Sequence, residues 1–178
     1  MTKTFALMVS MSSLLFTSYG SLANSLSVYF EGTLVPLGCR LSDDDTKKKV
    51  YLSGLRFSEL ENQGRSDIQP FQLDIVDCST AALNKTIKIT LNTQDTETHN
   101  GVTYLKTTGE SNVLLALTDG KNAQALKFNT PIDISTVTES GKGSINPLQF
   151  GVYAQKPFNG RLKTGSFSSL VTFNLDYQ

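Results

Sequence analysis

The sequence predicts an all-β sandwich in which one strand of a sheet is missing. From residue 27 onward, short runs of β-branched, aromatic and aliphatic residues are separated by turn clusters, and almost no stretch has helical periodicity. Strands are expected over residues 27–35, 50–55, 71–78, 86–91, 113–118, 125–128, 148–154 and 166–177. The last expected strand ends the chain, so no later segment can pair with its outer edge, and unpaired strand edges are unfavourable.

The first 23 residues have the pattern of a secretory signal peptide. Lys3 supplies one positive charge, residues 5–16 are an apolar stretch, and small residues lead up to Ala23. The stretch is shorter than the roughly 20 apolar residues of a membrane-spanning helix, so cleavage and export are expected. Cleavage after Ala23 leaves Asn24 first, and cleavage after Gly20 is the alternative. Without residues 1–23 the chain has 15 basic and 16 acidic residues, a balance that does not favour nucleic acid or anionic membranes.

Residues 26–34 follow with a strict alternation that contains one gap. One face of this expected strand carries Leu26, Val28, Phe30, Gly32 and Leu34. We call these five positions the N-terminal row. Such a row is suited to burial in a groove and not to exposure in water.

Both cysteines, Cys39 and Cys78, lie after the expected cleavage site. An exported chain with an even number of cysteines is expected to oxidise them, so the sequence predicts one disulfide between them. Closing a loop of about 40 residues contributes roughly 3 to 4 kcal/mol in the chain-entropy model.

Turn clusters separate the expected strands at residues 42–45, 119–122 and 140–143, where Gly, Asn and Asp suit turn conformations. The pattern over residues 59–69 does not decide between helix and loop, and we interpret it as a loop. No internal repeat, linker or low-complexity segment is visible, so a single domain is expected after the N-terminal segments.

The last expected strand also has one apolar face. Its inward positions are Phe167, Val171, Phe173, Leu175 and Tyr177. Because no strand follows it, a strand from outside must complete the sheet, and the N-terminal row of another subunit fits that need. Head-to-tail contacts of this kind do not close on themselves, so they produce filaments.

Three segments together resemble the pilin subunits of the chaperone–usher pathway of Gram-negative bacteria, over essentially the whole mature chain. Residues 28–39 (Val-Tyr-Phe-Glu-Gly-Thr-Leu-Val-Pro-Leu-Gly-Cys) resemble the extension that leads into the first cysteine of the family. Residues 70–78 (Pro-Phe-Gln-Leu-Asp-Ile-Val-Asp-Cys) resemble the segment that ends in the second. The tail has a glycine fourteenth from the end, Gly165, and a penultimate tyrosine, Tyr177.

The resemblance implies an incomplete immunoglobulin-like β-sandwich that lacks its last strand. It implies that a periplasmic pilus chaperone first supplies the missing strand, that an outer-membrane usher exports the subunit, and that a neighbouring fimbrial subunit then donates its extension. Residues 1–23 become the signal peptide, 24–37 the donor-strand extension and 38–178 the pilin domain. The N-terminal row becomes the donor strand, with Gly32 at the tight pocket. The acceptor groove and chaperone-recognition positions become Gly165, Phe167, Val171, Phe173, Leu175, Tyr177 and Gln178.

The resemblance also bears on the place of the subunit in a fimbria on the cell surface. Only fifteen mature residues precede Cys39, and so short an extension resembles minor or adaptor subunits. A major subunit of the rod is the alternative. A second alternative is a fimbria-associated glycan-binding module, in which Tyr29, Tyr51, Tyr104 and Tyr153 form an exposed aromatic face.

No enzymatic function, cofactor, catalytic residue or metal ligand is expected. The single histidine, His99, lies in a polar stretch that is interpreted as a loop, and no second histidine accompanies it. The run of three aspartates at residues 43–45 lacks the ligand spacing of a calcium loop and is interpreted as a solvated turn.

Overall fold

The computed structural model describes residues 38–178. The expected signal peptide, the strand over residues 27–35 and the N-terminal row (Leu26, Val28, Phe30, Gly32 and Leu34) lie outside the described residues.

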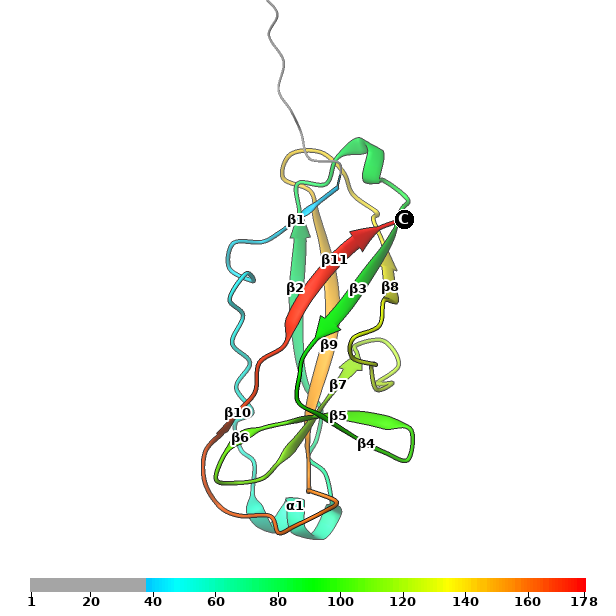
Figure 1. Ribbon diagram of the computed structural model, residues 1–178. Helices are drawn as coiled ribbons and strands as arrows, with labels where there is room; N and C mark the ends of the chain where they lie inside the picture. The colour runs from blue at the N-terminus through cyan, green and yellow to red at the C-terminus, as the bar shows by residue number, and fades with distance from the viewer. Residues whose placement is uncertain (1–37) are drawn as a thin grey trace, which may run out of the picture. The chain divides into compact units, whose positions relative to one another are not determined.

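Two main antiparallel sheets build the domain (Figure 1). The larger sheet has the strand order β1-β2-β9-β7-β5-β4, and the smaller one has the order β11-β3-β8. A short pair, β10 with β6, lies apart from both. The strands of the larger sheet are β1 (Arg40–Leu41), β2 (Gln69–Val76), β9 (Ile145–Gln155), β7 (Leu114–Asp119), β5 (Val102–Lys106) and β4 (Thr96–His99). The others are β11 (Thr172–Tyr177), β3 (Thr86–Asn92), β8 (Ile132–Thr136), β10 (Phe167–Ser168) and β6 (Thr108–Gly109).

The core lies between the two main sheets. Strand β3 turns Ile87, Ile89 and Leu91 inward, and all three are fully buried. Facing strands of the larger sheet contribute Ile75, Leu148 and Phe150, which are buried to the same degree. The alternation of buried and partly exposed residues along β3 is what a two-layer sandwich requires, so the all-β sandwich expected from the sequence is confirmed.

Two expected strands are absent from the described part of the chain. Residues 50–55 have no strand pairing, although Val50, Leu52 and Leu55 are partly buried against the core. Residues 125–128 make only an isolated bridge, Thr118 with Ala125. Both segments carry apolar residues into the core, but neither has a neighbouring strand along its length, and strand structure requires such a partner.

The interpretation of residues 59–69 as a loop is wrong for its first half. Helix α1 covers Phe57–Gln63 and ends at Gly64, whose N–H donates to the Leu60 carbonyl at 3.0 Å. No side chain caps its first turn, and Leu60 is its one buried residue. A helix held by one buried side chain leaves almost no periodic signal in the sequence.

Strands β4, β5 and β8 were not expected from the sequence. β4 and β5 form a hairpin around Asn100 and Gly101, which both have positive φ angles (49° and 80°). An Asn-Gly pair between two alternating segments is the sequence signal of such a hairpin. His99 therefore ends strand β4 and does not lie in a loop, and its ring stacks on Phe158 with a centroid distance of 3.7 Å.

The C-terminal segment is not one continuous strand. Strand β10 pairs with β6, whereas β11 pairs with β3, and residues 169–171 cross from one partner to the other. The prediction of one continuous strand over residues 166–177 is therefore wrong, because the segment forms two strands with different partners. Within residues 38–178, no helix is long and apolar enough to cross a membrane.

Candidate functional site

Strand β11 is bonded to the protein along one edge only. It pairs antiparallel with β3, from Thr172 opposite Asn92 to Tyr177 opposite Ile87. It is the end strand of its sheet, and its other edge has no strand partner among residues 38–178. A six-residue strand edge of this kind presents free N–H and C=O groups to an incoming strand.

The apolar face of β11 is only half covered. Phe173, Leu175 and Tyr177 are partly buried and pack on the core, while Asn174 and Asp176 between them are exposed. Phe173 meets Phe150 edge-on, with ring centroids 5.6 Å apart. Since core residues of the two sheets are almost fully buried, the intermediate exposure of this face marks a place where covering side chains are absent.

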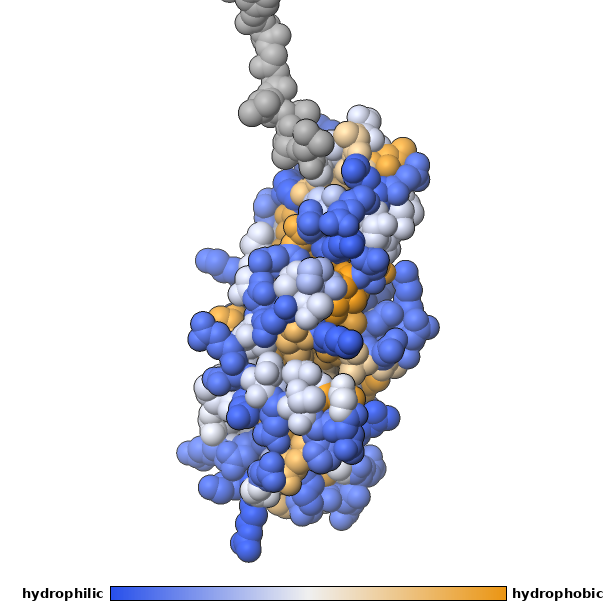
Figure 2. Space-filling model, turned by 45° about the vertical axis from the view of Figure 1, so that its right-hand side comes forward, coloured by the Kyte–Doolittle hydropathy of each residue, from blue (hydrophilic) through white to orange (hydrophobic). Residues whose placement is uncertain are grey.

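A groove lies between β11 and the segment of residues 41–52. It contains a cavity of about 360 Å³. Its two walls come from Leu41, Val50 and Leu52 on one side and Leu170, Val171 and Phe173 on the other. Its floor is lined by Phe71, Leu73, Leu105, Leu115, Leu117 and Val152. On the face drawn in Figure 2, apolar surface appears between polar side chains as a broken stripe.

The wall formed by Leu41, Val50 and Leu52 exists because β1 pairs with β2 over only a short distance. Strand β1 pairs with β2 only at Arg40 and Leu41. The buried Asp45 then accepts the Asp74 N–H at 2.7 Å, and it also accepts a bond from Lys48 Nζ at 2.6 Å. Asp45 thus occupies the backbone donor that a longer first strand would have used, and the chain turns away from β2 to form the wall of the groove.

Burial by itself raises the pKa of the Asp45 carboxyl. The hydrogen bonds from Lys48 and from the Asp74 amide outweigh that effect, so the pKa of Asp45 lies below its ordinary value. The carboxylate is therefore ionised when it holds the wall in place.

One end of the groove lies near helix α1. A second cavity of about 190 Å³ lies there, lined by Leu55, Phe57, Leu60, Val113, Leu162 and Phe167 among others. The predicted Gly165 lies in the loop beside it with φ of 148°, and a Cβ on this residue would come within 2.8 Å of Glu110 Cβ. Gly165 therefore serves a close approach of two loops at this end of the groove.

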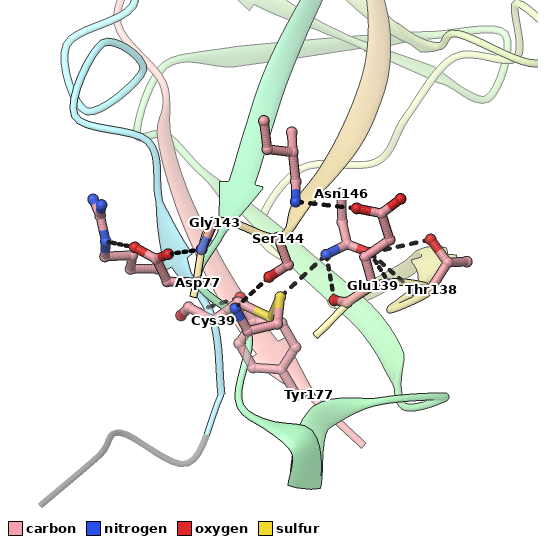
Figure 3. Close-up of a disulfide and its surroundings, with 11 residues drawn as sticks. Cys39, Asp77, Thr138, Glu139, Gly143, Ser144, Asn146 and Tyr177 are labelled. Atoms are coloured by element: carbon pink, nitrogen blue, oxygen red, sulfur yellow. Dashed lines mark hydrogen bonds and ion pairs between the residues drawn. A yellow bond between two sulfur atoms is a disulfide. The ribbon is translucent and has the colours of Figure 1, made fainter. Parts of the chain in front are cut away.

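At the other end of the domain, β11 contacts the chain beside the disulfide (Figure 3). The predicted bond between Cys39 and Cys78 is present, with an S–S distance of 2.06 Å. The Tyr177 hydroxyl donates to the Cys39 carbonyl at 3.4 Å. A Cβ on Gly38 would lie 3.1 Å from the Tyr177 ring, so the absence of a side chain at Gly38 lets this ring pack directly against the backbone there. Burial raises the pKa of Tyr177.

Asn146 organises the loops around the disulfide, as Figure 3 shows. This buried side chain accepts bonds from the N–H groups of Thr138 and Glu139 at 2.8 and 3.0 Å. It donates to the Glu139 carbonyl at 2.9 Å and to Cys78 Sγ at 3.2 Å. The side chain closes the loop between β8 and β9 against the disulfide.

The structure places the predicted acceptor positions along one line. Val171 and Phe173 line the groove, and Phe167 lines the cavity near helix α1. Leu175 and Tyr177 continue along β11 toward the disulfide and pack on the core. Gln178 is exposed, and its backbone exchanges two hydrogen bonds with Thr86, of 3.0 and 2.7 Å. Asp45 and the wall formed by Leu41, Val50 and Leu52 were not predicted as site residues. The apolar residues at 50, 52 and 55 indicated a buried segment there, which was interpreted as a strand of the sandwich.

Two other sequence-based interpretations concern possible ligands. The prediction of an exposed aromatic face is wrong in part, because the side chains of Tyr104 and Tyr153 are buried, with 7% and 6% of their surface exposed. Burial, together with Tyr153, raises the pKa of Tyr104 to about 12. In the described range 38–178, no group of three or more His, Cys, Asp or Glu residues could hold a metal ion.

Comparison with known proteins gives consistent matches. The model of the family described as Fimbrial protein matches residues 28–178. The Major MR/P fimbria protein of Proteus mirabilis (strain HI4320) is 26% identical over 153 residues, covering 85% of this chain and 83% of the relative. The PRS fimbrial major pilin protein of Escherichia coli is 24% identical over 155 residues, covering 85% and 93%.

Solved structures show the same fold. A subunit in the structure of a chaperone–usher pilus superposes with a TM-score of 0.65 at 21% identity, covering 88% of this chain and 97% of that one. The P pilus rod subunit PapA superposes with a TM-score of 0.61 at 19% identity, covering 79% and 99%. The sandwich is therefore the immunoglobulin-like fold of pilus subunits.

Proposed function

Because the chain belongs to the Fimbrial protein family, we propose that this fimbrial subunit assembles by strand exchange. The groove beside β11 accepts the extension of a neighbouring subunit, and the extension of this chain enters the next groove. The observation that carries the proposal is the outer edge of β11, which has no strand partner within residues 38–178, above a half-buried apolar face. The acceptor positions are Phe167, Val171, Phe173, Leu175 and Tyr177, with Gly165 at the helix end and Gln178 at the terminus.

The donor is the N-terminal row. Its five positions are Leu26, Val28, Phe30, Gly32 and Leu34. Burying the four side chains that it carries supplies on the order of 6 to 12 kcal/mol, an upper bound before ordering entropy. Hydrogen bonds to the free edge of β11 add a backbone ladder, as in other cases of β-strand addition.

The subunit also needs a route to the cell surface on which its groove is protected. Residues 1–23 direct export, residues 24–37 form the extension, and residues 38–178 form the pilin domain. An apolar groove that stays open favours aggregation, so a periplasmic chaperone fills it until an outer-membrane usher brings the next subunit. The chaperone reads the tail up to Gln178, and a tag added after Gln178 should reduce fimbriation.

The place of the subunit in the fimbria has two candidates. The short extension before Cys39 supports a minor or adaptor subunit. The names of the two relatives, both major fimbrial proteins, support a major subunit of the rod. Immunogold labelling separates them, because a major subunit is labelled along whole fibres and an adaptor only at one end.

The first experiment compares thermal unfolding of the oxidised mature chain with the same chain carrying a short turn and residues 26–36 after Gln178. At 2 to 4 °C for each kcal/mol in a domain of this size, the added strand should raise the melting temperature by about 12 to 48 °C. Equal melting temperatures would mean that the sheet is already complete, and strand exchange would be rejected.

A further inference from the structure

We propose that a polar cavity beside the crossing from β10 to β11 binds a neutral monosaccharide unit of a glycan. The cavity has a volume of about 580 Å³, which lies within the usual range of small-molecule sites in proteins. Residues of the described chain form it by themselves, so the inference goes beyond the proposed strand exchange and does not depend on it.

Four segments that are far apart in the sequence build the cavity. They are the connection from β3 to β4, the end of β5 with the start of β6, the turn at Asn129, and residues 168–172. The Asn129 side chain accepts the Thr93 N–H at 3.0 Å, and the Ser169 hydroxyl donates to the Lys106 carbonyl at 3.1 Å. These bonds tie the walls to one another, so the shape of the cavity is preformed and a ligand does not have to order it.

Two side chains of opposite charge line the cavity without pairing. Asp95 and Lys106 occupy opposing positions on neighbouring segments, since the Lys106 N–H donates to the Asp95 carbonyl at 3.0 Å. Both residues are exposed, and within residues 38–178 neither side chain forms an ion pair with the other or with a third group. A carboxylate and an ammonium group in one cavity therefore remain available to a ligand, the first as an acceptor and the second as a donor.

The rest of the lining is polar and uncharged, with one exception. The amide side chains of Asn92, Gln94 and Asn129 line the cavity together with five Ser and Thr residues. The exception is Leu170, whose side chain is 83% exposed. A cavity with a single apolar residue does not suit an apolar ligand, because such a ligand needs hydrocarbon on most of its sides.

A sugar ring matches this chemistry. Each of its hydroxyl groups both donates and accepts hydrogen bonds, so one hydroxyl can donate to the Asp95 carboxylate while the next accepts from Lys106 or from an amide. The C–H face of the ring is apolar and can cover the exposed Leu170 side chain. An anionic ligand would be repelled by Asp95 and a cationic ligand by Lys106, so the two charges together favour a neutral one.

The cavity shares one wall with the acceptor groove. Ser169, Leu170 and Thr172 line both, whereas Asp95 and Lys106 line only the polar cavity. A strand that fills the groove therefore does not cover the two charged side chains. A fibre with several copies of the subunit presents several such sites, and multivalent contact with a glycan-covered surface then exceeds the affinity of one site.

Titration of the oxidised mature chain with methyl glycosides tests the site, with binding followed by NMR in the forms with and without the added C-terminal strand. The probes are the glycosides of galactose, mannose and N-acetylglucosamine. At least one should bind with a dissociation constant on the order of 1 mM, at the weak end of the affinity scale. Asp95→Asn keeps the size of the side chain and removes its charge, and Lys106→Met removes the ammonium group. Each change should weaken binding about tenfold, because hydrogen bonds to charged groups are stronger than neutral ones.

Two matched controls make the same chemical changes elsewhere. Asp44→Asn and Lys127→Met alter exposed residues that line neither the polar cavity nor the groove. Both controls should bind the glycoside as the parent chain does. All four variants should melt with the parent chain, because exposed side chains away from the core are replaced, and equal melting shows that a loss of binding is not a loss of folding.

The outcomes separate this inference from strand exchange. If none of the three glycosides binds in either form, the sugar site is rejected. If a glycoside binds but Asp95→Asn and Lys106→Met bind it as the parent does, the sugar lies elsewhere and this cavity is rejected. If the two controls lose as much binding as the two site variants, the effect is one of overall charge and the cavity is again rejected. The melting comparison with the added strand decides strand exchange separately, so either idea can fail while the other stands.

Discussion

Phe173 offers the sharpest test of the groove, because replacing it by alanine should cost more free energy with the groove filled than with the groove empty. In the empty groove the ring is half-buried and packs on Phe150. A donor strand would cover its exposed side. Truncating a fully buried Phe costs about 3 to 5 kcal/mol, and a half-buried one loses roughly half as much.

Phe173→Ala should therefore cost about 2 kcal/mol more free energy of unfolding with the groove filled than with the groove empty. This difference corresponds to roughly 30-fold weaker donor binding, at 1.4 kcal/mol for each factor of ten. In the chain with the added C-terminal strand, the melting temperature should fall about 4 to 8 °C further than in the chain without it. Urea unfolding of both forms, followed by circular dichroism at low protein concentration, measures the two free energies.

Two controls accompany this variant. Asn174→Ala changes the outward neighbour of Phe173 on the same strand and should have little effect in either form. Leu148→Ala removes a core side chain that is 1% exposed and should cost the same in both forms. Equal losses for Phe173→Ala in the two forms would refute the argument that a strand covers this ring.

Three further predictions concern stability. Replacing Cys39 and Cys78 by serine should lower the free energy of unfolding by about 4 kcal/mol, which calorimetry with and without reductant can check. Asn146→Ala should cost about 2 to 4 kcal/mol, because it leaves two backbone N–H groups and one carbonyl without their partner; a loss below 1 kcal/mol in urea unfolding would contradict this. The lowered pKa of Asp45 means that its contribution is complete above the ordinary value of 3.8 and is lost as the pH falls through the lower folded-state pKa. Asp45→Asn should therefore destabilise the chain at pH 7 but have little effect near pH 2, and equal effects at both pH values would argue against the Lys48 pairing.

The sequence alone determined which face of the C-terminal segment is turned inward and which cysteines pair. Alternation predicted the inward positions of the tail from Phe167 to Tyr177, and the structure finds each of them partly buried. An even cysteine count in an exported chain predicted the Cys39–Cys78 bond. These features follow from local periodicity and from chemistry, which the order of residues carries directly.

Only the tertiary structure decided which backbone partners each segment has. Residues 50–55 have the composition of a strand, yet they form a wall of the groove because no described strand lies beside them. The tail divides into β10 and β11 because its two halves meet different strands. Asp45 acquires its role only where the chain brings it to the Asp74 amide, 29 residues away. A strand needs a partner from elsewhere in the chain, and residue periodicity reports which face is buried but not which neighbour is present.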